Sequence, residues 1–462
     1  MLKYRVKIKS LKAGDILGKK PSKFNFLIET DNDKVIVVNT FTGAIDILHS
    51  DEANHLFTDS EIDYNSNEYL CKRQYLIDDD VSEDILLEKY FESIKNYRRE
   101  NKSLSCVIIL TFDCNLRCTY CWQQNNIHES HSRTITFNQI DKIFDSIEKL
   151  LLSLEHAKRD TPIIQLIGGE PLLYKNRDIV AYILKKCKER NWYSQITSNG
   201  SQLKEFMDIF EEHGVGEIQV TIDGYSTVHE KRRVGSNFKD TMDSLDSLIQ
   251  SDKTYIKLRV NTDVENIDSL PYLADEIINR RWYTSSRFYA YISPLRDSSL
   301  RETKLIKDRI NLLKSFIEKR LNYPQLEIFD VLGWNGYETA KHLENTGRMP
   351  YPKGFICDMN MNNFVFTPNG EIHLCLEEAH ESKASVGRYS PDFYMDKVLF
   401  DNKYDNTPFT SIECKDCNIV PICSGGCQMI DKNKEYKKEF CQSVKECFSL
   451  GVENYLETEG LI

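Results

Sequence analysis

The chain has 462 residues, of which 40% are apolar and 28% charged, and it contains only 20 glycines and 12 prolines. This length predicts about three domains, and the composition excludes disordered, collagen-like and low-complexity chains. The formal charge of −11 argues against nucleic-acid binding, and the absence of any run of 18 uncharged apolar residues argues against a membrane span.

The start of the chain, Met1-Leu-Lys-Tyr-Arg-Val-Lys-Ile-Lys, has no signal-peptide core, so we expect a cytoplasmic protein. In that compartment, most of the 14 cysteines are expected to be metal ligands rather than disulfides. Cys71, Cys106 and Cys187 stand apart from the two cysteine groups and are interpreted as packing residues.

Residues 1–100 predict a separate small domain. Apolar runs at 24–29 and 35–38 flank a turn, which predicts a hairpin, and a further strand is expected near 73–77. A short polar helix is expected over 51–61. Asp80 and Glu83 resemble an N-cap pair, and the helix after them is expected to bury one face made by Ile85, Leu86, Tyr90, Phe91 and Ile94. We interpret this segment as a winged-helix-like domain with a connecting helix.

Residues 101–335 alternate strand and helix patterns. Apolar runs predict strands buried on both faces at 106–110, 163–167, 193–197, 217–222, 256–260 and 287–292. Helical periodicity predicts helices at 140–154, 176–190, 202–212, 240–250, 267–280 and 301–321. Six such units in succession imply right-handed parallel crossovers, and six are too few for a closed eight-stranded barrel. The prediction is an α/β fold, a partial (β/α)6 barrel.

The unusual short motifs all follow predicted strands. They are Asp113–Cys121, Gly168-Gly169-Glu170-Pro171, Thr197-Ser198-Asn199-Gly200, Asp223-Gly224 and Asn261-Thr262-Asp263. Because the loops after parallel strands meet at one end of a barrel, we expect a site there.

Three cysteines, Cys114, Cys118 and Cys121, supply three thiolates from one of these loops. Three thiolates on a four-iron cluster leave one iron open to a cofactor or substrate. The alternative is a structural zinc site completed by His128 or His131.

The CxxxCxxC spacing, with an aromatic residue between the last two cysteines, resembles the radical S-adenosylmethionine (radical SAM) enzymes over about residues 105–321. The resemblance implies that Cys114, Cys118 and Cys121 are the catalytic cysteines and hold a [4Fe–4S] cluster. The open iron of that cluster would chelate S-adenosylmethionine, and a 5′-deoxyadenosyl radical would abstract a substrate hydrogen. An external one-electron reductant such as flavodoxin or ferredoxin is implied as a partner.

The resemblance also implies cofactor-binding residues. Gly168, Gly169 and Glu170 match the segment that binds the methionine amino group, and Tyr120 matches the aromatic position beside the adenine. Ser198 and Asn199 match a strand-end position that meets the ribose or carboxylate. Asp223 belongs to a segment that matches the family's SxDG motif, with Thr221 in place of serine. Arg233 is a candidate partner for the carboxylate, and a solvated basic turn is the alternative for it.

The cysteines of residues 336–462 resemble those of the SPASM domain, which is found on radical SAM enzymes that act on peptides and proteins. The matching cysteines are Cys357, Cys375, Cys414, Cys417, Cys423, Cys427 and Cys441, and residues 368–375 resemble the domain's β-hairpin. The resemblance implies two auxiliary [4Fe–4S] clusters. Cys357, Cys375 and Cys427 would hold the inner cluster, and Cys414, Cys417, Cys423 and Cys441 the outer one.

Two ligand questions stay open in this region. We prefer Cys441 to Cys447 as the last ligand, which makes Cys447 a half-buried helical thiol. The inner cluster lacks a fourth cysteine, so its last iron is closed by Asp358, water or an unassigned residue, or is open to a substrate thiolate.

Residues 1–100 are similar to the leader-recognition elements of radical SAM enzymes that mature ribosomally made peptides (RiPPs), where a leader adds as a β-strand. The hypothesis is therefore an oxidoreductase that installs a crosslink, in the first instance a Cys thioether, in a precursor peptide with a leader. The alternatives are a sulfatase-maturase-like oxidase that forms formylglycine, a cyclase that forms carbon–carbon crosslinks, and a catalytically silent iron–sulfur or zinc scaffold.

Overall fold

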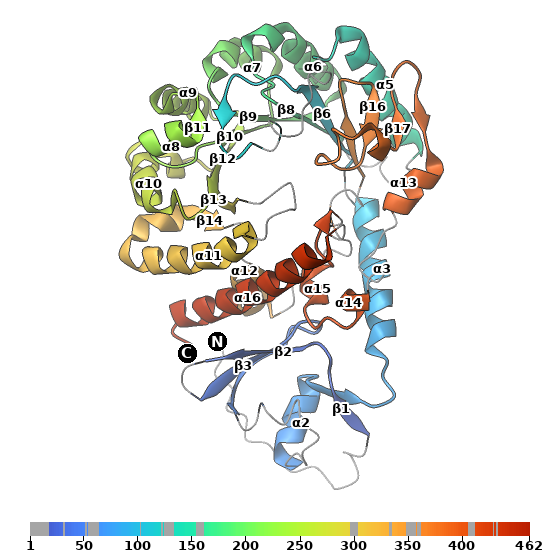
Figure 1. Cartoon of the computed structure of the whole chain (residues 1–462), viewed down its shortest axis with the longest axis vertical. Coiled ribbons are helices and arrows are strands. Elements are labelled where there is room, and N and C mark those ends of the chain that lie inside the picture. The colour runs from blue at the N-terminus through green and yellow to red at the C-terminus, as the bar shows by residue number, and fades with distance from the viewer. Residues whose placement is uncertain are drawn as a thin grey trace. The chain divides into compact units, whose positions relative to one another are not determined.

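The computed structural model describes residues 18–30, 33–50, 53, 64–101, 103–121, 123, 134–153, 161–295, 304–331, 335–347, 357, 362–404, 412–427, 429–430 and 433–462. The chain forms two compact units (Figure 1). Unit 1 comprises residues 1–97, 334–357 and 406–462, and unit 2 comprises residues 98–333 and 358–405. In the part of the chain that is described, no helix combines the length and the apolar character that crossing a bilayer requires.

The core of unit 2 is the predicted parallel sheet. Its six strands pair in chain order and are β6 (Ser105–Thr111), β8 (Ile163–Gly168), β9 (Tyr193–Ser198), β10 (Glu217–Thr221), β12 (Tyr255–Thr262) and β13 (Phe288–Pro294). The helices between and after them are α5 (Phe137–Ser153), α6 (Arg177–Arg190), α7 (Met207–His213), α8 (Thr227–Arg232), α9 (Phe238–Ser251), α10 (Leu270–Asn279) and α11 (Lys304–Asn322). These helices lie along the outer side of the curved sheet (Figure 1). The predicted α/β partial barrel is confirmed.

Two further parallel strands extend this sheet beyond the prediction. β14 (Phe329–Val331) pairs with β13, and β15 (Asn363–Phe366) pairs with β6. β15 also forms the predicted hairpin with β16 (Glu371–His373), and β17 (Gly387–Arg388) and β18 (Tyr394–Met395) follow antiparallel. Helix α13 (Lys397–Tyr404) completes this region.

The prediction that the strands are buried on both faces is correct for β6 but wrong for β8, β9, β10 and β12, whose burial alternates along most of the strand. One face of these strands packs apolar side chains, whereas the other face is half-buried and polar. Its members include Gln165, Gln195, Thr197, Gln219, Lys257 and Arg259. The physical reason is that an open barrel does not fill its interior with apolar layers, so these side chains meet solvent and one another, as in the 3.2 Å bond from Gln165 to Thr197.

Unit 1 contains a three-stranded antiparallel sheet, ordered β2 (Asn25–Glu29), β3 (Lys34–Asn39) and β4 (Ile45–His49). The first two strands are the predicted hairpin. β1 (Lys19–Pro21) pairs with β5 (Leu76–Asp78), and α2 (Tyr64–Lys72) precedes β5. Most of the polar helix expected at 51–61 lies outside the described residues.

Segments from the two ends of the chain share the core of unit 1. Phe26 of β2 contacts Phe448 of α16 (Lys434–Thr458), with ring centroids 5.4 Å apart. A β-carbon on Gly336 of α12 (Asn335–Thr346) would lie 1.9 Å from the carbonyl oxygen of Phe448, so this glycine permits the close crossing of α12 and α16. The short helices α14 (Ile412–Lys415) and α15 (Val420–Cys423) complete unit 1.

The connecting helix α3 (Glu83–Asn101) forms as predicted, and Phe91 and Ile94 are buried as expected, but the start of the predicted face is wrong. Ile85 and Leu86, predicted to be on the apolar face, are 53% and 46% exposed. The buried stripe is Leu87, Phe91 and Ile94, at the i, i+4, i+7 spacing that one helix face requires.

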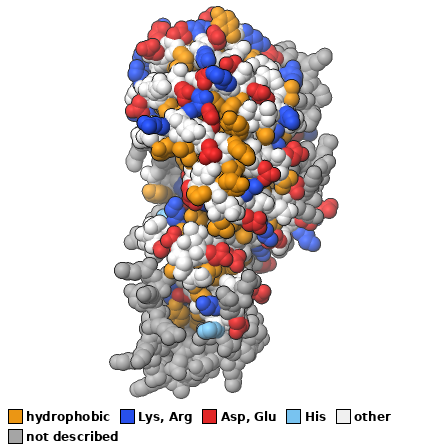
Figure 2. All heavy atoms as spheres, turned by 90° about the vertical axis from the view of Figure 1, so that its left-hand side faces the viewer, with side chains coloured by type: hydrophobic (Ala, Val, Ile, Leu, Met, Phe, Trp, Pro, Cys, Tyr) orange, Lys and Arg blue, Asp and Glu red, His pale blue; other side chains and the backbone are white. Residues whose placement is uncertain are grey.

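Figure 2 shows the side of unit 2 on which α8–α11 lie, where hydrophobic side chains gather in a band among charged ones. Exposed apolar side chains of this part of the chain include Tyr225, Val264, Tyr272, Tyr283, Leu321 and Tyr323.

Candidate active site at the carboxyl ends of the barrel strands

The predicted motifs meet at one end of the sheet of unit 2. β6, β8, β9, β10 and β12 are parallel neighbours, so the segments after them lie at the same edge. Hydrogen bonds join these segments directly, from the cysteine loop to the segments that follow β9, β10 and β12.

The glycine segment after β8 packs against the backbone that leads into the cysteine loop. Gly169 and Glu170 donate backbone hydrogen bonds of 2.8 Å to the carbonyl oxygens of Thr111 and Asp113. A β-carbon on Gly168 would lie 2.1 Å from the Thr111 oxygen, and one on Gly169 would lie 2.2 Å from the Asp113 oxygen. Both positions therefore require glycine, because only backbone hydrogen atoms fit between the two segments.

The Glu170 carboxylate points toward the end of β9 and is 1% exposed. It accepts hydrogen bonds from the Ser198 hydroxyl (2.8 Å) and from the backbone N–H groups of Asn199 (2.6 Å) and Leu172 (2.9 Å). Burial raises the pKa of Glu170, and these three donors oppose the rise. In this arrangement Glu170 and Ser198 bond each other, and Glu170 fixes the backbone at Asn199.

The Asn199 side chain reaches the first cysteine. Its Nδ2 lies 3.8 Å from the Cys114 sulfur and 3.0 Å from Asn115 Oδ1. The backbone N–H of Leu116 also donates to the Cys114 sulfur, at 3.4 Å. Burial raises the pKa of the Cys114 thiol, and the hydrogen bonds from Leu116 and Asn199 oppose that rise.

The second cysteine lies in a two-stranded ladder. β7 (Arg117–Cys118) pairs with β11 (Arg233–Val234), and Arg233 is the partner of Cys118. Burial raises the pKa of the Cys118 thiol to about 11, although the positive charge of Arg233 opposes the rise.

The hydroxyl group of Tyr120 joins three motifs. It donates to a carboxylate oxygen of Asp223 and accepts from Arg233 (2.7 Å) and from Asn261 Nδ2 (3.1 Å). Asp223 is fully buried and Arg233 is 7% exposed. Burial raises the pKa of Asp223, and Arg233, Tyr120 and Arg232 oppose that rise. The tyrosine ring is therefore held by its hydroxyl within a charged network.

Arg232 and His229 support this network. The Arg232 guanidinium lies 5.3 Å from the centroid of the Tyr120 ring and forms a 2.9 Å ion pair with Asp263. His229 Nδ1 accepts a 3.1 Å hydrogen bond from the backbone N–H of Asp223. Burial lowers the pKa of His229 to about 3, so its ring is neutral.

Several buried polar atoms here have no hydrogen-bond partner among the described residues. They include Asp223 Oδ1, Arg233 Nε and His229 Nε2. Buried polar groups in proteins are almost always hydrogen-bonded. An unpaired carboxylate oxygen and an unpaired guanidinium nitrogen beside the cysteine loop therefore fit a polar ligand that carries both an ammonium group and a carboxylate.

The three thiols of the loop are close enough to influence one another. Cys121 raises the pKa of both Cys114 and Cys118, and its backbone N–H donates to the carbonyl oxygen of Cys118. Within the described ranges, no three His, Cys, Asp or Glu side chains converge on one metal-ion position. The ligands of a four-iron cluster bind separate irons and need not converge in that way. His128 and His131, the alternative zinc ligands, lie outside the described residues.

A second set of thiols gathers in unit 1. Burial and the thiols of Cys441, Cys417 and Cys414 raise the pKa of Cys423 to about 12. Burial and the thiols of Cys414 and Cys417 raise the pKa of Cys441. The buried hydroxyls of Ser424 and Ser443 beside this set have no hydrogen-bond partner among the described residues. Such hydroxyls are available to the sulfur atoms of a cluster, so the donor set fits one.

Cys447 also lies on α16 but differs from Cys441 in environment. It is 2% exposed, so the expected half-buried thiol is fully buried, because this part of α16 contributes Val444 and Phe448 to the core of unit 1. Six residues along a helix correspond to a rotation of about 240°, so the two thiols point in different directions.

The thiols predicted for the inner cluster are all half-buried. Cys357 and Cys427 belong to unit 1, and Cys375 belongs to unit 2. Asp358, a candidate for its fourth ligand, lies outside the described residues.

The sequence placed Asn261 in a motif at the end of a predicted strand but gave it no partner, and it gave no role to Arg232 or His229. The signal for Asn261 is a polar residue at the end of a barrel strand, here β12. Arg232 and His229 lie on α8 among other charged residues, and only the fold separates them from its exposed members.

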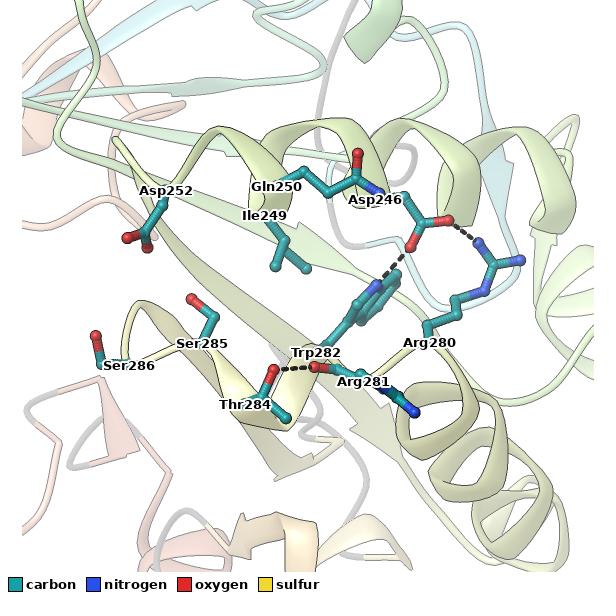
Figure 3. Close-up of a pocket in the computed structure, with 10 residues that line it drawn as sticks. All are labelled: Asp246, Ile249, Gln250, Asp252, Arg280, Arg281, Trp282, Thr284, Ser285 and Ser286. Atoms are coloured by element: carbon teal, nitrogen blue, oxygen red, sulfur yellow. Dashed lines mark hydrogen bonds and ion pairs between the residues drawn. The ribbon is translucent and has the colours of Figure 1, made fainter.

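A hollow of about 450 Å³ occurs elsewhere in unit 2, between α9 and the segment after α10 (Figure 3). Trp282 and Arg280 lie at one side of it and both donate to Asp246. It lies where helices lead into strands, which is the end of the barrel opposite the cysteine loop.

Comparison with known proteins finds a family that matches the barrel region of this chain. The radical SAM superfamily matches residues 108–305. The chain is 24% identical over 381 residues to the cysteine-type anaerobic sulfatase-maturating enzyme of Clostridium novyi, covering 76% of this chain and 96% of that protein. It is 23% identical over 309 residues to the GTP 3′,8-cyclase of Limosilactobacillus fermentum, covering 65% of this chain and 87% of that protein.

Two solved structures share the fold. The structure of anSMEcpe with bound AdoMet and Cp18Cys peptide has a TM-score of 0.52 at 18% identity, covering 78% of this chain and all of that one. The structure of Streptococcus suis SuiB bound to precursor peptide SuiA has a TM-score of 0.52 at 15% identity, covering 91% of this chain and 98% of that one.

Proposed function

Because the chain is a radical SAM enzyme, we propose that it matures a ribosomally made precursor peptide by removing a hydrogen atom and closing a crosslink, in the first instance a thioether from a Cys sulfur. The observation that carries the proposal is the meeting of the cysteine loop with Asp223 and Arg233 at the end of a barrel whose inner face is polar. Such a lumen suits a peptide backbone, which must satisfy its polar groups.

The residues that would hold the cofactors follow from the site. Cys114, Cys118 and Cys121 would hold a [4Fe–4S] cluster, and its remaining iron would be available to S-adenosylmethionine. When bound, the cluster and S-adenosylmethionine supply one-electron chemistry that leads to hydrogen abstraction from the substrate. An external protein such as flavodoxin or ferredoxin would supply the electron.

The chain's own residues would bind and orient S-adenosylmethionine. Arg233 would pair with its carboxylate, and Tyr120 and Asp223 hold Arg233 in place for that contact. An ammonium group needs acceptors, and the carbonyl oxygens of residues 168–170 would supply them. The N–H groups of Gly169 and Glu170 hold this segment in place through their bonds to the backbone of Thr111 and Asp113. Burial of these charges keeps water away from the reacting atoms.

The cysteines of the C-terminal region would hold two auxiliary [4Fe–4S] clusters, with Cys414, Cys417, Cys423 and Cys441 at the outer one and Cys357, Cys375 and Cys427 at the inner one. The seven thiols leave one iron ligand to come from elsewhere, and a substrate thiolate would fit that position. This count favours a reaction at a Cys sulfur over other crosslinks.

The sheet of unit 1 would bind the leader. Among the described strands, β2 and β4 each pair only with β3, so both are edges of the sheet. A leader that adds to one edge as a further strand would gain main-chain hydrogen bonds whatever its side chains.

The alternative with specific support is a sulfatase-maturase-like oxidase that forms formylglycine, because the Clostridium novyi relative is matched over 96% of its length. A cyclase that forms carbon–carbon crosslinks is the remaining candidate. The three differ in the fate of the substrate thiol, which makes them separable by product analysis.

The test uses anaerobically reconstituted protein, dithionite, S-adenosylmethionine and a cysteine-containing candidate precursor peptide. A product two hydrogens lighter that no longer reacts with iodoacetamide supports the thioether. The same mass with the thiol retained indicates a carbon–carbon bond, and an aldehyde trapped by a hydrazine indicates formylglycine. An unchanged mass, or 5′-deoxyadenosine formed by Cys118→Ala protein, contradicts the proposal.

A further inference from the structure

We propose that Asn199 hydrogen-bonds the thiolate of Cys114 and thereby raises the reduction potential of the cluster bound there. The inference rests on the proposed function, because it requires a [4Fe–4S] cluster on the cysteine loop. It gives Asn199 a positioning role toward the cluster, whereas the family resemblance implies contact with the ribose or carboxylate of S-adenosylmethionine.

Two nitrogen donors surround the Cys114 sulfur. Asn199 Nδ2 lies 3.8 Å from it and the backbone nitrogen of Leu116 lies 3.4 Å from it. Sulfur hydrogen bonds are longer than those to oxygen because the atom is larger. Leu116 belongs to the same loop as Cys114, but Asn199 comes from the end of β9 and is 5% exposed. The second donor is therefore provided by the fold rather than by the cysteine motif.

The orientation of the Asn199 amide follows from its neighbours. Its Nδ2 donates to Asn115 Oδ1 at 3.0 Å, and its Oδ1 accepts from the backbone N–H (2.9 Å) and the hydroxyl (2.6 Å) of Ser201. If the amide were turned over, its oxygen would face the sulfur and another oxygen, and its NH2 group would face the Ser201 N–H. Only one orientation satisfies every partner, and it points the NH2 group at Cys114.

Glu170 fixes the backbone that carries this amide. Its carboxylate accepts from the Asn199 N–H at 2.6 Å and from two other donors, so β8 and β9 are tied together at the point where Asn199 emerges. The polar atoms of the Asn199 side chain are all engaged within the cysteine loop and Ser201. None of them is left for a nucleoside or a carboxylate.

A hydrogen bond to a cluster thiolate stabilises the more negative, reduced state. Hydrogen bonds to the sulfurs are among the terms that set the potential of an iron–sulfur cluster, together with net charge and solvent exposure. Removing the Asn199 donor should therefore shift the midpoint potential to a more negative value and make the cluster harder to reduce.

The experiment compares wild-type protein with Asn199→Ala, Asn199→Asp and Asn279→Ala. Asn199→Asp keeps the shape and the acceptor for Ser201 but replaces the donor. Asn279→Ala makes the same exchange at an exposed position at the end of α10 and serves as the control. The midpoint potential is measured by redox titration monitored by electron paramagnetic resonance, without S-adenosylmethionine. The relevant cluster is identified as the one whose spectrum changes when S-adenosylmethionine is added. Iron content and the Kd for S-adenosylmethionine are measured on the same samples.

We expect both Asn199 variants to show a more negative midpoint potential, with Asn199→Asp shifted further, and Asn279→Ala to stay near the wild type. The Kd for S-adenosylmethionine should change little. An unchanged potential with a weaker Kd in either iron-loaded variant would overturn the role of Asn199 and make it a cofactor ligand. A wild-type protein with no cluster that responds to S-adenosylmethionine would instead overturn the proposed function.

Discussion

Arg233 lies directly opposite Cys118 in the two-stranded antiparallel ladder that β11 forms with β7. The backbone N–H of Thr119 extends the ladder by donating to the carbonyl oxygen of Arg232 at 2.9 Å. The segment that carries the buried charges is thus bonded to the segment that carries the thiols. A cofactor bound at this cysteine loop would have a guanidinium beside it at a fixed position.

Replacing Arg233 by Met should weaken binding of S-adenosylmethionine by about tenfold or more, because a charge-assisted hydrogen bond to its carboxylate is lost. The negative charge of buried Asp223 also loses one of the two positive charges near it. Equilibrium dialysis against iron-loaded protein measures the Kd. Lys231→Met removes the same charge from an exposed neighbour and is the control, with wild-type affinity expected. Equal affinities in the two variants would place Arg233 outside the binding site.

Replacing Tyr120 by Phe keeps the ring but removes the hydroxyl that bridges Asp223, Arg233 and Asn261. Leaving buried partners unpaired costs about 1–3 kcal/mol, so we expect a KM for S-adenosylmethionine raised by about tenfold, with iron content retained. Steady-state formation of 5′-deoxyadenosine measures this change. Tyr225→Phe alters a tyrosine that is 39% exposed and should behave as wild type. A normal KM for Tyr120→Phe would show that the hydroxyl does not position Arg233.

Much of the site could be predicted because it depends on local sequence and on one rule of topology. The spacing of Cys114, Cys118 and Cys121 is local, and the loops after parallel strands must meet at one end of the sheet. The positions of Glu170 and Asp223 followed from that rule. The hydrogen-bond partners of these side chains could not be predicted from it. Glu170 bonds Ser198 and Asn199, and Tyr120 bonds Asp223, only because separate loops pack together.

Two features of the fold were also missed because they depend on contacts between distant parts of the chain. β15 joins the sheet beside β6 from more than 250 residues away, and no sequence period records such a pairing. The buried face of α3 is set by what packs on it, namely Phe24, Cys414 and Val420. Ile85 and Leu86 are apolar enough to fit a helical stripe in the sequence, yet they are exposed and do not belong to this cluster of described residues.

Replacing Gly169 by Ala should disrupt the site by steric overlap. The new β-carbon would lie 2.2 Å from the Asp113 oxygen, and a backbone atom cannot move aside as a flexible side chain can. We expect a loss of about 1–3 kcal/mol in the free energy of unfolding and reduced iron at the cysteine loop. Gly460→Ala, where no atom lies within 4 Å of the new carbon but φ is +65°, is the control in urea unfolding and iron assays. It adds backbone strain without steric overlap, so it should keep its full iron content and lose at most about 1 kcal/mol of stability. Full iron loading of Gly169→Ala would contradict the close packing.

Cys441 and Cys447 should respond differently to replacement by Ala. Loss of Cys441 removes a thiol that interacts with Cys414 and Cys417, so iron should fall from about twelve to about eight atoms per chain. Loss of buried Cys447 should leave the iron content unchanged and lower the free energy of unfolding by about 1 kcal/mol, because a small cavity forms in the core. Iron analysis and urea unfolding separate the two effects. The reverse pattern would make Cys447 the last ligand.

His229 should make the fold sensitive to acid. Its pKa is lowered to about 3 by burial, whereas an unfolded histidine titrates near 6.5. Below about pH 6.5 the unfolded chain therefore binds more protons than the folded one, and the free energy of unfolding falls as the pH falls. The loss attributable to this residue is about 2 kcal/mol between pH 7.5 and pH 5.

His229→Asn removes this titration while keeping an acceptor near the Asp223 N–H. Urea unfolding of the metal-free, reduced protein at pH 7.5 and pH 5 gives the change in the free energy of unfolding for the wild type and for the variant. Titratable groups that both proteins share contribute equally to the two changes, so the difference between them reports His229. We expect the variant to lose less stability on acidification than the wild type. Parallel pH dependences would mean that the ring is protonated in the folded protein, and then Nδ1 could not accept the hydrogen bond that holds Asp223.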